Sequence, residues 1–295
     1  MLTTILAYAG RPLAQAGRTL AHAGEPLAPH DLWRTWNVDP VLLVALAAGV
    51  WAYRRGRVAS ARPTDARRAR AFAGALAALA IALISPLEPL SGALASAHMG
   101  QHVLLVLVAG PLLAVSAPGS RLLRGSPLAV RRARGAARRR FGLRSSWLHA
   151  PSHPATVLLL HVGVLWVWHS AAAYDAALRS DLVHGVEHVT FLVTAVLFWR
   201  VVAGGRATRR VPGGAGVLLV FGAAMASVFL SLLLTFANEP WYEGYATTTP
   251  AWGLDPLADQ HLAGVLMWVP AGAIYVVAAL ALFVSWIAET EEPAS

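Results

Sequence analysis

Seven apolar segments divide this chain and leave too little polar sequence to enclose them in a soluble fold. They lie at roughly residues 40–53, 71–87, 98–117, 154–169, 183–202, 216–237 and 260–288. A bilayer-crossing helix needs about 17 to 25 apolar residues, a length that all but the first and fourth segments reach. Only 13% of residues are charged, about half the share of a typical soluble domain. We therefore predict an all-α, polytopic membrane protein, with a bundle of about seven transmembrane helices in residues 39–288.

Arginine sets the expected orientation, because the chain contains no lysine. Twenty of the 24 arginines lie in three alternate connections, residues 54–70, 121–144 and 200–210. Basic loops stay on the cytoplasmic side of a membrane, so these three connections are expected inside. Residues 1–38 then form an extracytoplasmic N-terminal extension, and residues 289–295 form a short acidic cytoplasmic tail.

The same arginines explain the charge of the chain. A net charge of +9 and a pI near 11.1 are also typical of nucleic-acid-binding proteins. Loops that set orientation account for the charge without a nucleic acid, and each arginine near anionic lipid headgroups contributes about 1 kcal/mol. We expect a bilayer with anionic headgroups as a partner, and no nucleic acid.

Histidines gather at the helix ends that this topology places outside. His98 and His102 are four residues apart and share one helical face, and His184 and His188 repeat that spacing with Glu187 beside them. Single histidines are often hydrogen-bonded interfacial residues, but two such pairs on one side favour a ligand site. With no cysteine present, a metal must be held by imidazole, thioether or carboxylate. The candidate metal ligands are His98, His102, His169, His184, His188, His261 and Glu187.

Imidazole alone does not choose the metal, since it suits zinc, copper, iron and haem. Met99 and Met267 offer thioethers for cuprous ion, but they lie about 100° and 120° away from His98 and His261 on their helices. We expect both methionines to be core residues. His161, midway along the fourth segment, is the candidate axial ligand if the cofactor is haem.

Two further patterns bear on function. Residues 184–188 (HGVEH) match the H-x-x-E-H motif of inverted zinc peptidases, but a protease would not require the other histidines. We therefore predict that the protein is not an enzyme. The outer loop at residues 238–259 contains Trp241, Tyr242, Tyr245 and Trp252, which predicts a loop at the membrane interface or against a partner.

Several ordered motifs resemble the CtaG family of caa-type cytochrome c oxidase assembly factors. They include SPLEPLS at residues 85–91, HMGQHVLL at 98–105, AGPLL at 109–113, LWVWH at 165–169, DQHLAG at 259–264 and MWVP at 267–270. The resemblance extends from about Trp36 to Trp286. It departs where the family commonly has a proline after the histidine of the fourth segment, because this chain has Ser170 to Ala173 there.

This resemblance implies a protein of the bacterial cell membrane that helps to mature a haem-copper oxidase, with oxidase subunits as partners. Combined with the histidines, it leads to the hypothesis that the outer cluster binds copper, in its cuprous form, and delivers it to the apo-oxidase. Two alternatives are a haem-binding redox or haem-handling protein, and a metal-free chaperone of oxidase subunits.

Overall fold

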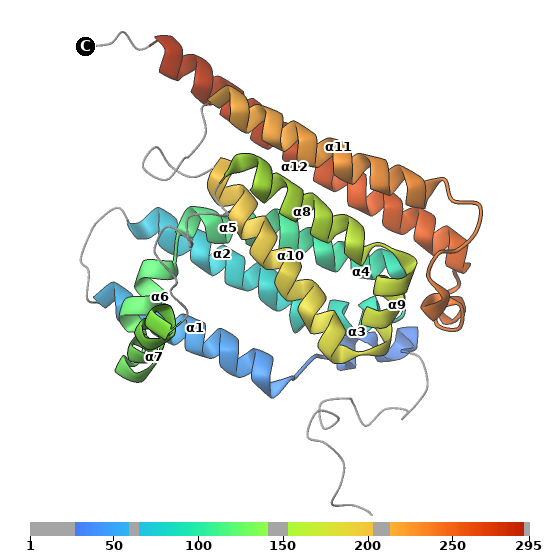
Figure 1. The fold of residues 1–295 in the computed structure, drawn as a ribbon. Coiled ribbons are helices and arrows are strands. Elements are labelled where there is room, and N and C mark those ends of the chain that lie inside the picture. The colour runs from blue at the N-terminus through green and yellow to red at the C-terminus, as the bar shows by residue number, and fades with distance from the viewer. Residues whose placement is uncertain (1–26, 59–64, 141–152, 203–212, 292–295) are drawn as a thin grey trace, which may run out of the picture.

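The structure, a computed structural model, describes residues 27–58, 65–140, 153–202 and 213–291, and these are helical with no strand among them (Figure 1). The prediction of an all-α fold is therefore confirmed. The helices are α1 (Pro40–Val58), α2 (Asp65–Leu83), α3 (Leu87–Ser91), α4 (Ala95–Val103), α5 (Gly110–Ser116), α6 (Gly119–Gly125), α7 (Leu128–Arg140), α8 (Pro154–Trp168), α9 (Ala171–Arg179), α10 (Asp181–Val202), α11 (Gly213–Thr235) and α12 (Pro256–Glu291). A π-helical segment (Leu104–Ala109) joins α4 to α5, and short 3-10 turns occupy Pro29–Arg34, Glu243–Tyr245 and Thr249–Trp252.

Four helical stretches are long and apolar enough to cross a membrane. They are Ala95–Ser116, Asp181–Val202, Gly214–Thr235 and Pro256–Ala288. A fifth results if α8 and α9, which are bent by 71° at their junction, count as one span.

The predicted count of about seven spans is not confirmed. Helices α1 and α2 form where two of the spans were expected, but each carries three arginines within 19 residues and is too polar to qualify. Helix α8 has 15 residues. At about 1.5 Å per residue it is shorter than the roughly 30 Å hydrocarbon core of a bilayer.

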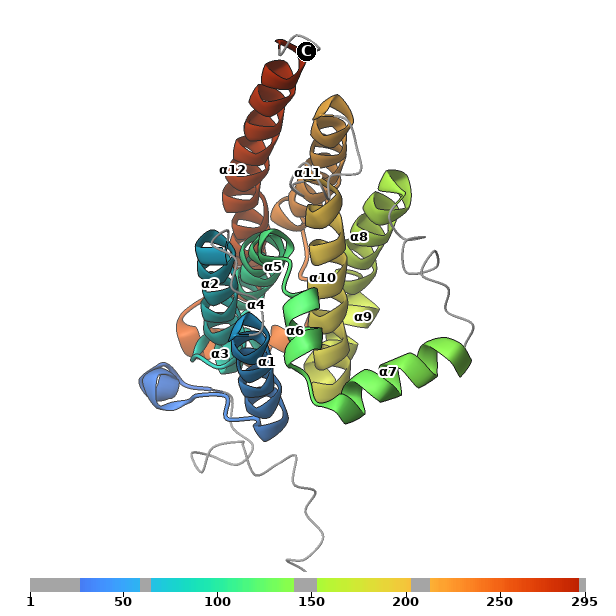
Figure 2. The same cartoon turned by 90° about the vertical axis from the view of Figure 1, so that its left-hand side faces the viewer.

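The two ends of the bundle differ in chemistry. Helices α3 and α9 lie at one end, and α6 with the arginine-rich α7 lies at the other (Figures 1 and 2). Parts of the predicted basic connections, residues 59–64, 141–144 and 203–210, lie outside the described residues. So do residues 1–26 of the N-terminal extension and residues 292–295 of the acidic tail. The side of the membrane that each end faces stays a prediction.

The span that carries His98 and His102 changes its helical pitch just after them. The amide of Gly110 donates to the carbonyl of Leu105, five residues earlier, which is the π-helical pattern. Pro111 follows and has no amide hydrogen, so the ordinary hydrogen bond to Leu107 is missing. π-Helical turns within α-helices are found frequently at functional sites.

Helices α11 and α12 form a long pair along one side of the bundle (Figure 1). They approach each other closely at Gly264 of α12. A Cβ atom at this position would lie 2.3 Å from the Thr235 hydroxyl and 2.9 Å from the Ser231 carbonyl. Small residues allow such close approach between helices in membranes, and glycine is required here by space.

We predict that Gly264→Ala lowers the free energy of unfolding by about 1 to 3 kcal/mol, because the added methyl group overpacks the contact. Thermal unfolding of the detergent-purified protein measures the effect. Gly272→Ala is the control on the same helix, since a Cβ there would meet nothing within 4 Å. Equal unfolding temperatures for the two variants would contradict the proposed role of Gly264.

Candidate metal centre

The two histidine pairs predicted from their spacing face each other across α4 and α10. The rings of His98 and His102 lie 4.4 Å apart between centroids, and those of His184 and His188 lie 4.1 Å apart. Between the helices, His98 lies 5.1 Å from His184, and His102 lies 5.6 Å from His188. The packing of two helices that run in the same direction thus joins two local pairs into one cluster.

Glu187 lies within this cluster. Its two carboxylate oxygens are each 3.5 Å from an imidazole nitrogen, one from Nε2 of His98 and the other from Nε2 of His102. His98, His102, Glu187 and His188 are all buried, and each places one ligand atom within 4.8 Å of the others'. One ion can bind all four after small shifts of the side chains, because bonds of about 2.0 to 2.2 Å to nitrogen and oxygen keep two ligands of one ion within about 4.4 Å of each other.

The hydrogen bonds around His98 fix which nitrogen is free. The Tyr245 hydroxyl donates to the Ser91 carbonyl at 2.8 Å, so its oxygen can accept from Nδ1–H of His98, 3.1 Å away. The neutral imidazole then presents the bare lone pair of Nε2 toward the cluster. This is the form in which a histidine binds a metal.

The cluster holds buried polar atoms that have no hydrogen-bond partner among the described residues. They are Nε2 of His98, His184 and His188, both ring nitrogens of His102, and both carboxylate oxygens of Glu187. Buried polar atoms in folded proteins are nearly always hydrogen-bonded, and a concentration of exceptions indicates an ion or water. The donor set therefore fits a metal ion.

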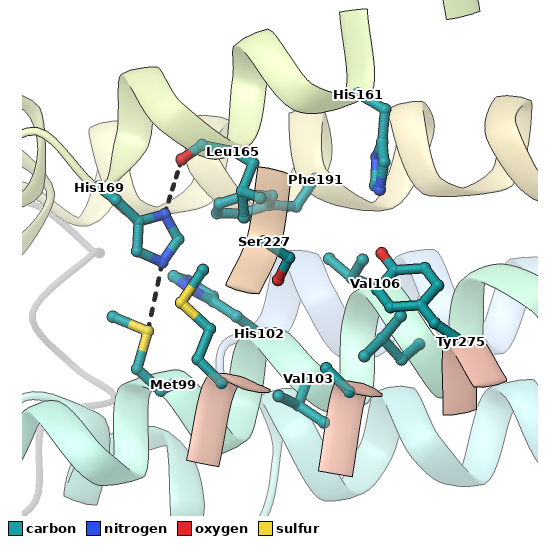
Figure 3. Close-up of a pocket in the computed structure, with 13 residues that line it drawn as sticks. Met99, His102, Val103, Val106, His161, Leu165, His169, Phe191, Ser227 and Tyr275 are labelled. Carbon is teal, nitrogen blue, oxygen red and sulfur yellow. Dashed lines mark hydrogen bonds between the residues drawn. The ribbon is translucent and has the colours of Figure 1, made fainter. Parts of the chain in front are cut away.

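His169 lies at the edge of the cluster, at the end of α8. Its Nδ1 is 2.7 Å from the Leu165 carbonyl, and its Nε2 is 3.3 Å from the sulfur of Met99 (Figure 3). Its ring is 5.8 Å from that of His102. Met99 was expected to be a core residue, and it is buried. The 100° rotation that turns it away from His98 also turns it toward α8, where it contacts His169.

Two predicted site residues are not brought together with the others. His261 is half-buried, and its Nε2 is 2.9 Å from the Ala237 carbonyl just after α11, away from the ring contacts of the cluster. His161 lies in the middle of α8, before His169. Its Nδ1 is 3.5 Å from the Thr194 hydroxyl, and its ring stacks on Phe198.

Sequence reasoning missed Asp259, which fixes the start of α4. This fully buried carboxylate, in α12, accepts from the amides of Ala95 and Ser96 at 2.6 and 3.3 Å, and from the Ser96 hydroxyl. Free amides at a helix N-terminus favour a negative charge and an acceptor. Asp259 therefore holds the helix that presents His98 and His102. Its position two residues before His261 was the only available signal.

Sequence reasoning also misplaced two tyrosines of the outer loop. Tyr242 and Tyr245 are buried over the histidines, whereas Trp241 and Trp252 remain half-buried. Tyr242 donates to the His169 carbonyl at 3.2 Å and stacks on Tyr174. Burial raises the pKa of both loop tyrosines, Tyr242 and Tyr245, well above the ordinary value. They therefore stay protonated and serve as hydrogen-bond donors.

A cavity extends from the cluster into the bundle. Its volume is about 30 Å³, and Met267 is among the residues that line it. His102, Met99 and His169 lie at one end, and His161, Ser227 and Tyr275 lie further in (Figure 3). This volume is enough for roughly two water molecules. The cavity links the cluster to the apolar interior.

Comparison with known proteins shows the family of the chain. The profile of the family described as cytochrome c oxidase caa3 assembly factor (Caa3_CtaG) matches residues 44–289. The chain belongs to the CtaG family. The match covers both histidine pairs, Glu187 and Asp259, so the whole cluster lies within the shared domain.

Three mycobacterial relatives contain a similar region within longer chains. Uncharacterized proteins of Mycobacterium bovis and Mycobacterium tuberculosis are each 26% identical over 259 residues, which is 86% of this chain and 39% of theirs. An uncharacterized protein of Mycobacterium leprae is 25% identical over 213 residues, 71% of this chain and 32% of its own. This CtaG protein thus spans well under half the length of these relatives. No solved structure matches it.

We predict that Asp259→Ala lowers the free energy of unfolding by about 0.5 to 2 kcal/mol, as loss of a helix cap does, and also weakens metal binding. The second effect follows because α4 loses the contact that positions its histidines. Asp255→Ala is the matched control, since exposed Asp255 caps α12 itself by accepting from the amides of Leu257 and Ala258. Chemical denaturation and metal titration should show lower stability in both variants but weaker metal binding only in Asp259→Ala.

Proposed function

We propose that this CtaG protein binds a copper ion in the cluster of His98, His102, Glu187 and His188. It delivers the ion to an apo-oxidase subunit at the extracytoplasmic surface of the cell membrane. The observation that carries the proposal is the convergence of buried, unpartnered ligand atoms from α4 and α10. Membership of an oxidase assembly family supplies the recipient, because a haem-copper oxidase must acquire copper during its maturation.

Copper is favoured over haem by the space available. The cavity beside His161 holds only about two waters, and the His161 ring already stacks on Phe198. A porphyrin would require the helices to separate. Copper needs only the side chains that are present, and imidazole is among its preferred ligands.

Delivery requires that the ion leave the protein again. The cluster contains no thiolate, the ligand that would hold cuprous ion most firmly. Tyr245 and Tyr242 cover it from the loop at residues 238–255, through hydrogen bonds to His98 and the backbone of His169. Displacement of this loop by a docked oxidase subunit would uncover the ligands. The role is binding and transfer, with no catalysed reaction.

We expect the detergent-purified protein to bind one cuprous ion tightly in an anaerobic titration against a competing chelator. His98→Ala/His102→Ala should weaken binding by about 100-fold or more, since removal of even an outer-shell partner weakens a site 10- to 100-fold. His30→Ala/His153→Ala, which removes two exposed histidines, is the control and should bind like the wild type. Equal affinity in all three proteins would overturn the copper proposal, and a Soret band in the purified protein would favour haem.

In cells that depend on this protein for oxidase maturation, Glu187→Gln and His98→Ala/His102→Ala should each reduce the copper content and activity of the oxidase. The variants must accumulate in the membrane at wild-type levels, as judged by immunoblotting. A fully active oxidase in both strains would favour the metal-free chaperone, because that role does not depend on ligand atoms.

A further inference from the structure

We propose that this protein holds a second, softer copper position next to the first, formed by the thioethers of Met99 and Met267 with the imidazole of His169, and reached through His102. It takes cuprous ion in preference to divalent ions. This inference rests on the proposed function, because it assigns the oxidation state of the copper and the direction in which the ion enters the bundle.

The contact between His169 and Met99 carries the argument. The Leu165 carbonyl, 2.7 Å from Nδ1 of His169, can only accept a hydrogen bond, so Nδ1 bears the proton of the neutral ring. Nε2 is then a bare lone pair, and it lies 3.3 Å from the Met99 sulfur, which has no hydrogen to donate. Two electron-pair donors therefore face each other within a buried site.

A cation bound between these two donors removes the repulsion between their lone pairs. Donor atoms 3.3 Å apart lie within reach of one ion, because metal bonds to nitrogen and sulfur are about 2.0 and 2.3 Å long. Thioether sulfur is a soft ligand that selects cuprous ion over the divalent metals that carboxylates prefer. Met267 is also buried, and it lines the same cavity as Met99 and His169.

His102 connects the two positions. Its ring lies 4.4 Å from that of His98 and 5.6 Å from that of His188 on one side, and 5.8 Å from that of His169 on the other. Both of its nitrogens lack a hydrogen-bond partner among the described residues. An ion can thus stay bound to His102 while it exchanges its imidazole and carboxylate ligands for the thioether ligands. It passes between the two positions without entering bulk water.

The deciding variant is Met99→Leu/Met267→Leu, since this exchange nearly conserves side-chain volume and removes only the sulfurs. We expect X-ray absorption of the cuprous wild type to show sulfur bound to copper at about 2.3 Å, a typical metal–sulfur bond length. The variant should lose this signal. Its cuprous affinity should fall by about 10-fold or more, the minimum effect of losing supporting ligand contacts. Zinc affinity, which depends on Glu187, His98 and His188, should not change.

Two further variants complete the test. Met225→Leu removes an exposed sulfur from α11 and should keep the copper–sulfur signal. Glu187→Gln should weaken zinc binding and also keep that signal.

Histidine-dependent cuprous binding without any copper–sulfur signal in the wild type would overturn the second position and leave the proposed function intact. The absence of cuprous binding in the wild type would overturn both. The wild-type spectrum decides between these results even if the double methionine variant folds poorly.

Discussion

The burial of imidazole and carboxylate groups inside an apolar helix bundle is the constraint on which the rest of this structure depends. A buried polar atom without a partner destabilises a protein by about 1 to 3 kcal/mol, and the cluster between α4 and α10 contains several such atoms. The fold tolerates them only because other interactions hold the helices in place. Chief among these is Asp259, which ties the start of α12 to the start of α4.

The surrounding hydrogen bonds orient the histidine rings and leave the nitrogens that face the interior free to bind a metal. Tyr245 accepts from the far nitrogen of His98, and the Leu165 carbonyl accepts from the far nitrogen of His169. In both cases the nitrogen that faces the interior keeps its lone pair. Histidine ligands of metals in proteins are oriented in this way. The arrangement explains why buried tyrosines, rather than exposed aromatic residues, lie above the cluster.

The membrane architecture is less regular than the pattern of apolar segments indicated. Helices formed at all seven segments, because hydrophobic periodicity and length are local properties. Whether each helix can cross a bilayer is a different question, which depends on the charges at its end and on its length. Arginines in α1 and α2, and the 71° bend that separates the short α8 from α9, remove three segments from the simple count.

The sequence by itself determined the helices, the family and the two histidine pairs, since a spacing of four residues places side chains on one helical face whatever the fold. Only the tertiary structure decided which of these groups meet. It joined His98 and His102 to Glu187 and His188, separated His261 from them, and brought Met99 to His169 across 70 positions of sequence. The reason is that contacts between helices depend on their packing and on buried hydrogen bonds such as those of Asp259, and neither leaves a periodic signal in the chain.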